Sequence, residues 1–148
     1  MHRGKKPSLA KLLDELRRHY HEEARGHLPW RATRDPYKVL VSEVMLQQTQ
    51  VERVIPYYKR FIRSFPSARA LSRASLHNVL HLWQGLGYNR RAKFLHQAAK
   101  VVAKKGFPKT VEEIEELPGV GHYTARAVAA FAYNQPAAFV ETNIRTVF

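Results

Sequence analysis

Glu43 is a carboxylate in a place where the chain is otherwise apolar. It lies within the run VLVSEVML, residues 39–46, and burying an ionised carboxylate is costly. One interpretation is that Glu43 makes a local cap or salt bridge. The other is a general acid, because apolar surroundings raise the pKa of a carboxyl group and keep its proton available near neutrality. The pattern alone leaves both interpretations open.

A second carboxylate, Glu141, comes just before a helix that we expect to begin near Thr142. Negative charge at a helix N-terminus is favourable by about 0.3–1 kcal/mol. That interaction is a sufficient structural reason for Glu141, so its position by itself does not indicate catalysis.

An anion site is predicted in the stretch LPGVGHYTA, residues 117–125. The amides of Val120, Gly121 and His122 should point outward at the start of a helix, where bare N–H groups bind phosphate and glycine lets it approach closely. The alternative is a plain helical hairpin with glycine in its turn.

Two short helices should flank this turn. Thr110 and Glu113 have the spacing of a capping box, so the first helix should begin there. Pro118 and Gly119 should end it. The second helix is expected to reach Tyr133.

The composition narrows the class of partner. The 148 residues carry a net charge of +13, which suits a partner that carries phosphates, either a nucleic acid or an anionic membrane surface. No apolar run is long enough to span a bilayer, and the N-terminus lacks the apolar centre of a signal peptide. Cysteine is absent, and the spacing of His77 and His81 is insufficient to predict a metal site.

The remaining hydrophobic spacing predicts further helices separated by turn residues. A first helix capped by Ser8 should present one apolar face, formed by Leu9, Leu12, Leu13, Leu16 and Tyr20. Other helices are expected from the Asp35-Pro36 cap to Leu46, over residues 50–65, from Ser67, from Ser75 and over residues 89–105, with a loop at 25–34. No stretch sustains the alternation of a strand, so the predicted fold class is all-α.

Five segments of the chain closely resemble the helix-hairpin-helix base-excision DNA glycosylases, and the MutY-type adenine glycosylases most of all. They are LPWR, DPYKVLVSEVMLQQTQVERVIPYYKRF, VLHLWQGLGYNRRAKFLH, LPGVGHYTA and VETNIRTVF. The resemblance implies a six-helix barrel domain over residues 28–136, with the hairpin at 110–133. Residues 1–27 and 137–148 would be pieces of a second helical domain, and the chain would be an N-terminal fragment.

The resemblance also implies catalytic roles. Glu43 would protonate the purine ring and so make the base a better leaving group. Glu141 stands where the family has an aspartate that supports the oxocarbenium-like sugar, and it is one methylene longer. Tyr123 stands where the bifunctional branch has a lysine that forms a Schiff base, so we expect a monofunctional enzyme.

Extruding a base leaves a gap in the duplex that an amide or an aromatic ring can fill. Gln47, Gln48 and Tyr88 are the candidates, and the resemblance assigns this wedging to Gln48 and Tyr88. A solvated helix end and an ordinary turn aromatic are the alternatives.

The resemblance places three further residues in the base pocket, namely Trp30, Arg31 and Leu46. Contacts with the DNA backbone are expected from Arg90, Arg91 and Lys93, although a solvated basic face is the alternative. The hairpin residues expected to bind DNA are Gly119, Val120, Gly121, His122 and Thr124.

The activity implied is hydrolysis of the N-glycosidic bond of adenine mispaired with 8-oxoguanine or guanine in double-stranded DNA. The alternatives are a thymine or uracil mismatch glycosylase and an inactive DNA-binding fragment. Where members of the family have a [4Fe–4S] cluster, four cysteines beyond these residues hold it, so a cluster is possible there and no cofactor or metal is expected within these residues. We also expect a cytoplasmic monomer, associated with the nucleoid if bacterial, and no membrane partner.

Overall fold

The computed structural model of the protein describes residues 8–22 and 27–136. Those residues form helices and connecting turns with no strand, which confirms the all-α prediction. The chain divides into two compact units, Met1–Ala32 and Thr33–Phe148. Among the described helices, none combines the length and the apolar character needed to cross a bilayer.

The first unit contains α1, Leu9–Glu22, and the short 3-10 helix η1, Pro29–Arg31. The amide of Lys11 donates to the hydroxyl of Ser8 (3.3 Å), as expected of a helix cap. The prediction of a loop over residues 25–34 is partly wrong, because η1 lies within that range. The apolar face predicted for α1 is exposed in its described part, formed by Leu9, Leu12, Leu13 and Leu16; the side chain of Tyr20 lies outside the described residues.

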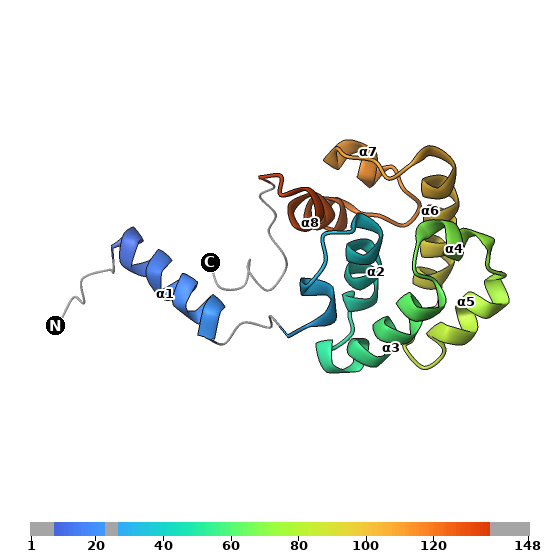
Figure 1. Ribbon diagram of the computed structural model, residues 1–148, viewed down its shortest axis with the longest axis horizontal. Coiled ribbons are helices and arrows are strands. Elements are labelled where there is room, and N and C mark those ends of the chain that lie inside the picture. The colour runs from blue at the N-terminus through green and yellow to red at the C-terminus, as the bar shows by residue number, and fades with distance from the viewer. Residues whose placement is uncertain (1–7, 23–26, 137–148) are drawn as a thin grey trace. The chain divides into compact units, whose positions relative to one another are not determined.

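The second unit is organised around α2, Pro36–Leu46. Its first turn is fixed by Asp35, whose carboxylate accepts a hydrogen bond from the amide of Tyr37 (2.9 Å). Seven of its eleven residues are buried, so the helix is apolar nearly all round and must be central. It lies between α8, His122–Tyr133, and α3, Val51–Ser64 (Figure 1).

The other helices complete the core. They are α4, Ala68–Arg73; α5, Leu76–Trp83; α6, Arg90–Lys105; and α7, Val111–Glu115. Hydroxyls cap two of them as predicted, because Ser67 accepts from Ala70 N and Ser75 from Asn78 N. Trp83 and Phe61 are fully buried and meet edge to face, with ring centroids 5.9 Å apart.

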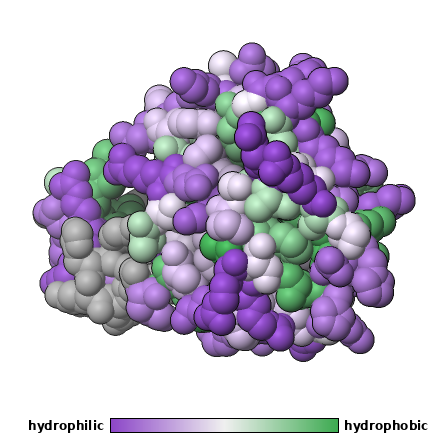
Figure 2. All heavy atoms as spheres, turned by 45° about the vertical axis from the view of Figure 1, so that its right-hand side comes forward, coloured by the Kyte–Doolittle hydropathy of each residue, from purple (hydrophilic) through white to green (hydrophobic). Residues whose placement is uncertain are grey.

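Hydrophilic residues cover most of one face of the molecule, with smaller apolar areas between them (Figure 2). The sequence contains 25 lysines and arginines against 12 acidic residues. The charged residues of the protein are therefore mainly basic.

Candidate nucleic-acid interface

The predicted wedging residues lie in two short connections. Residues 47–49, which we call the glutamine segment, lie between α2 and α3, and residues 85–89, the tyrosine segment, lie between α5 and α6. Gln48 and Tyr88 both have left-handed backbones, with φ of 55° and 50°, a conformation uncommon outside glycine. Both side chains are exposed, and Tyr88 retains 64% of its accessible surface. Their geometry suits side chains that project from the surface.

Gln47 differs from Gln48, because its side chain is half-buried and turned inward. Its amide Nε2 donates to the hydroxyl of Thr124 (3.1 Å), which is itself buried. This bond joins the end of α2 to the first turn of α8. A DNA contact from Thr124 would accordingly use its main-chain amide, and contacts from both residues stay predictions.

Arg91 holds the two segments together. Its guanidinium Nη1 and Nη2 atoms donate to oxygens from the end of α2, the glutamine segment and the tyrosine segment. The acceptors are the carbonyls of Val44 (2.9 Å), Met45 (3.1 Å), Gln47 (2.5 Å) and Gly87 (3.1 Å) and the hydroxyl of Thr49 (3.3 Å). The guanidinium carbon also lies 5.5 Å from the ring centroids of Trp83 and Tyr88. Burial lowers the pKa of Arg91, partly offset by Tyr88.

Arg90 and Lys93 are exposed neighbours of Arg91 on α6. Arg90 lies over the ring of Phe94, with its guanidinium carbon 5.7 Å from the ring centroid. Their predicted contacts with the DNA backbone stay predictions, as does that of Arg91, whose described hydrogen bonds are all made within the protein.

The helical hairpin forms as predicted, with a capping bond from Glu113 N to Thr110 Oγ1 (3.3 Å). Gly119 has φ of 73°, and a Cβ there would lie 2.5 Å from the Cβ of Phe94, so this position requires glycine. Gly121 is the N-cap of α8 with an ordinary φ of −88°.

One of the three amides predicted to bind an anion is engaged within the protein. The amide of Val120 donates to the carbonyl of Leu117 (3.1 Å) and does not point outward. The prediction was wrong for Val120 because this amide is used within the turn itself. No side chain caps α8, and the first amides of a helix have no acceptor within it. His122 pairs with Glu115 (3.1 Å) across the hairpin.

Glu43 and Tyr123 lie on the packed pair α2 and α8. Glu43 is half-buried between the buried residues Ser42 and Val44, whereas Tyr123 is 39% exposed. Glu141 lies outside the described residues.

The predicted base-pocket residues fall in different units. Trp30 is buried and Arg31 exposed in the first unit, whereas Leu46 is half-buried in the second. The pocket itself stays a prediction.

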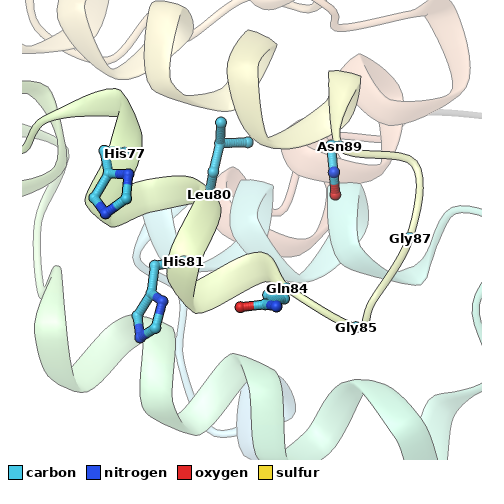
Figure 3. Close-up of a pocket in the computed structure, with 7 residues that line it drawn as sticks. All are labelled: His77, Leu80, His81, Gln84, Gly85, Gly87 and Asn89. Carbon is cyan, nitrogen blue, oxygen red and sulfur yellow. The ribbon is translucent and has the colours of Figure 1, made fainter.

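A cavity of about 440 Å³ borders the tyrosine segment (Figure 3). Its lining consists of His77, Leu80, His81, Gln84, Gly85, Gly87 and Asn89. The two imidazoles lie at the opposite end of the cavity from Asn89 in the close-up. In the described part of the chain, no group of three or more His, Cys, Asp or Glu side chains could hold a metal ion.

Comparison with known proteins identifies the family. The pattern of the HhH-GPD superfamily base excision DNA repair proteins matches residues 41–148. This chain belongs to the HhH-GPD superfamily.

Similar curated members of the superfamily are adenine DNA glycosylases. Those of Buchnera aphidicola (subsp. Baizongia pistaciae), Mycobacterium tuberculosis and Mus musculus are 44%, 45% and 43% identical over 86% of this chain. The chain spans only 37%, 43% and 27% of their lengths.

Solved HhH-GPD structures share the fold. A thermostable thymine-DNA glycosylase superposes with a TM-score of 0.82 and 29% identity, covering 90% of this chain and 63% of that one. An endonuclease III–DNA complex superposes with a TM-score of 0.78 and 24% identity, covering 94% of this chain and 65% of that one.

Sequence reasoning missed the internal hydrogen bonds of two polar side chains, the half-buried Arg91 and the buried His96. It assigned Arg91 only to the surface, and it gave no role to His96, which is buried with Nε2 2.9 Å from the carbonyl of Ala74. The acceptors of Arg91 on α2 and in the glutamine segment lie 42 to 47 residues away in the sequence. No local pattern predicts such contacts.

Proposed function

We propose that the protein is a monofunctional DNA glycosylase that releases adenine mispaired with 8-oxoguanine or guanine in double-stranded DNA. The observation that carries the proposal is the position of Glu43, a half-buried carboxylate on the central apolar helix α2. That helix packs against the hairpin helix α8 and leads directly into the glutamine segment. The adenine DNA glycosylases to which the chain is similar support the choice of base.

In the proposed reaction Glu43 donates a proton to the adenine ring, which makes the base a better leaving group. A general acid of this kind typically contributes 10²- to 10⁴-fold in rate. Glu141 supplies the negative charge that stabilises the sugar cation. Water then adds to the sugar, because the phenol of Tyr123 cannot form a Schiff base.

DNA would be bound through its phosphates and opened by the wedge. The amides at the start of α8 face a phosphate, Gly119 and Gly121 let it approach, and basic side chains such as Arg90 add charge. Gln48 and Tyr88 enter the gap left by the extruded base, which would be held by Trp30, Arg31 and Leu46. The barrel would comprise residues 28–136, and residues 1–27 and 137–148 would belong to a second helical domain.

The residues in hand do not fit an iron–sulfur cluster. Such clusters are held by cysteine thiolates, and the 148 residues contain no cysteine. Any cluster would need ligands from outside this sequence, and no step of the proposed reaction involves one.

A thymine or uracil mismatch glycosylase is the second candidate. It is favoured by the likeness to the thermostable thymine-DNA glycosylase and by Tyr123, because tyrosine at this position resembles the thymine-removing mismatch enzymes as well as some adenine glycosylases. The third, a DNA-binding protein without activity, is kept open by glutamate at position 141. The base released distinguishes all three.

The test is single-turnover base release by the complete natural protein that carries these residues. Duplexes would contain one adenine opposite 8-oxoguanine or guanine, or one thymine or uracil opposite guanine, and chromatography would identify the product. Glu43→Gln should slow adenine release by about 10²- to 10⁴-fold with DNA binding retained. Glu52→Gln, which changes an exposed carboxylate on α3, should not slow it. Release by Glu43→Gln at the wild-type rate would refute the mechanism.

Glu141 is tested in the same assay. Glu141→Gln should slow release, because an amide carries no charge to set against the sugar cation. Glu141→Asp should leave release equal or faster if the extra methylene misplaces the carboxylate, and slower if the site is spaced for glutamate. Wild-type release by Glu141→Gln would remove this residue from the proposal.

A further inference from the structure

Arg91 is a charged side chain whose described partners are all uncharged oxygens. Five hydrogen bonds reach from its Nη1 and Nη2 atoms to two stretches of the chain, residues 44–49 and Gly87. Within the described residues it makes no ion pair with a carboxylate. A cation placed in this way is stabilised by carbonyl dipoles, and hydrogen bonds from a charged donor are stronger than neutral ones.

Two of the acceptors belong to the last turn of α2. The carbonyls of Val44 and Met45 have no partner within the helix, because the final four carbonyls of any helix lack one. The same end carries the partial negative charge of the helix dipole. Arg91 therefore caps the helix that carries Glu43, from a position on α6.

The other acceptors are in the two surface connections. The carbonyl of Gln47 and the hydroxyl of Thr49 flank Gln48 on both sides. The carbonyl of Gly87 directly precedes Tyr88, and the ring of Tyr88 lies 5.5 Å from the guanidinium carbon. The guanidinium of Arg91 thus binds the residues next to both left-handed positions, Gln48 and Tyr88.

We propose that Arg91 is a positioning residue that fixes the glutamine segment and the tyrosine segment as one pre-formed wedge. It acts through Gln48 and Tyr88 and makes no contact with DNA itself. The inference rests on the proposed function, because it takes these two residues as those that enter the duplex.

Lysine cannot replace arginine in this role. An ammonium group presents three donors from one atom, whereas the guanidinium presents its donors in a rigid planar fork. Here the fork divides its bonds, with Nη1 directed at Val44, Met45 and Gln47 and Nη2 at Thr49 and Gly87. Arg91→Lys keeps the positive charge but cannot bind both sets of acceptors. The variant therefore distinguishes the positioning role of Arg91 from the effect of its charge.

The experiment measures base extrusion without bond cleavage, using the complete natural protein and a duplex with 2-aminopurine at the target position. Arg91→Lys should lower the extrusion signal at saturating protein at least 10-fold. The salt dependence of binding should stay at the wild-type slope, whereas loss of a phosphate contact would reduce it by about 0.9. Arg69→Lys, on the exposed surface of α4, should change neither quantity.

Coupling to the wedge decides between a positioning and a merely structural role. In a protein carrying Gln48→Ala and Tyr88→Ala, the extrusion signal should already be low, and adding Arg91→Lys should lower it less than 2-fold further. Thr49→Val removes only one acceptor of Arg91 and serves if Arg91→Lys does not fold; it should lower the signal in the same direction by a smaller factor.

Three results would overturn the inference. One is a normal extrusion signal in Arg91→Lys or, where that variant does not fold, in Thr49→Val. Another is a salt-dependence slope reduced by about 0.9 in Arg91→Lys, as loss of one phosphate contact would give. The last is an effect of Arg91→Lys on the extrusion signal that is as large in the Gln48→Ala, Tyr88→Ala protein as in wild type. The proposed glycosylase activity is judged separately from the released base, so either idea can fail while the other stands.

Discussion

Gly119 offers a sharp test of how the hairpin is built, because two separate costs are expected on adding a methyl group there. The first is backbone strain at φ of 73°, about 1–2 kcal/mol for a residue other than glycine. The second is overlap, since the new Cβ would lie 2.5 Å from the Cβ and 2.9 Å from the Cγ of Phe94. Overpacking of this kind costs about 1–3 kcal/mol.

Gly119→Ala should therefore lower the free energy of unfolding by about 2–5 kcal/mol. At roughly 4 °C per kcal/mol for a domain of this size, the Tm should fall by about 8–20 °C. Thermal unfolding followed by circular dichroism at 222 nm, the helical signal, measures the change directly.

Two other glycines separate the two costs. Gly87 has φ of 85° with nothing within 4 Å of an added Cβ, so Gly87→Ala should show the strain alone. Gly121 has no positive φ, and nothing lies within 4 Å of a Cβ added there. Gly121→Ala should therefore lower the free energy of unfolding by only about 0.5–1 kcal/mol, because alanine is a poorer N-cap. If Gly119→Ala melts no lower than Gly87→Ala, the contact with Phe94 does not constrain the hairpin.

Three further outcomes are expected. Burial, and then Lys100, lower the pKa of His96 below its ordinary value of about 6.5. As the pH falls, the unfolded chain therefore takes up a proton at His96 more readily than the folded protein does. The contribution of neutral His96 to the free energy of unfolding is thus full above pH 6.5 and declines as the pH falls below it. The loss of Tm between pH 7 and pH 5 should be smaller in His96→Gln than in wild type, and unchanged in the exposed His77→Gln; equal losses in all three would contradict the assignment. Tyr37→Phe removes a buried hydrogen bond to the carbonyl of Phe65 (2.7 Å) and should cost about 1–3 kcal/mol in denaturant unfolding, against no change for the exposed Tyr88→Phe; a cost under 0.5 kcal/mol would mean that water replaces the bond. Borohydride should trap no adduct with abasic DNA at Tyr123, and a mapped adduct there would end the monofunctional assignment.

The helix boundaries were predictable because their causes are local. Asp35, Ser67 and Ser75 each directly precede a helix and accept a hydrogen bond from an amide two or three residues along the chain. Gly106 ends α6 with φ of 84°. Such signals need only a short stretch of sequence. The all-α fold class followed from the same spacing.

The geometry of the candidate site was less accessible, because it depends on residues distant in the sequence. The requirement for glycine at position 119 comes partly from Phe94, and the end of α2 is capped from α6 by Arg91. The amide of Val120, predicted to point outward, instead closes the turn on the carbonyl of Leu117. Residue types predicted which side chains are candidates, and packing decided how they are held.

The left-handed backbone at positions 48 and 88 has a consequence for variation at these sites. Branched side chains such as valine and isoleucine are strongly disfavoured there whatever their chemistry, whereas asparagine, aspartate and glycine fit the backbone well. A library randomised at both codons and sorted only for folded protein should be depleted of valine and isoleucine and enriched in asparagine and glycine. If the same library is sorted for function, the residue types that it samples are already limited by the backbone conformation. The absence of a residue type at either position is then not evidence that it is incompatible with DNA binding.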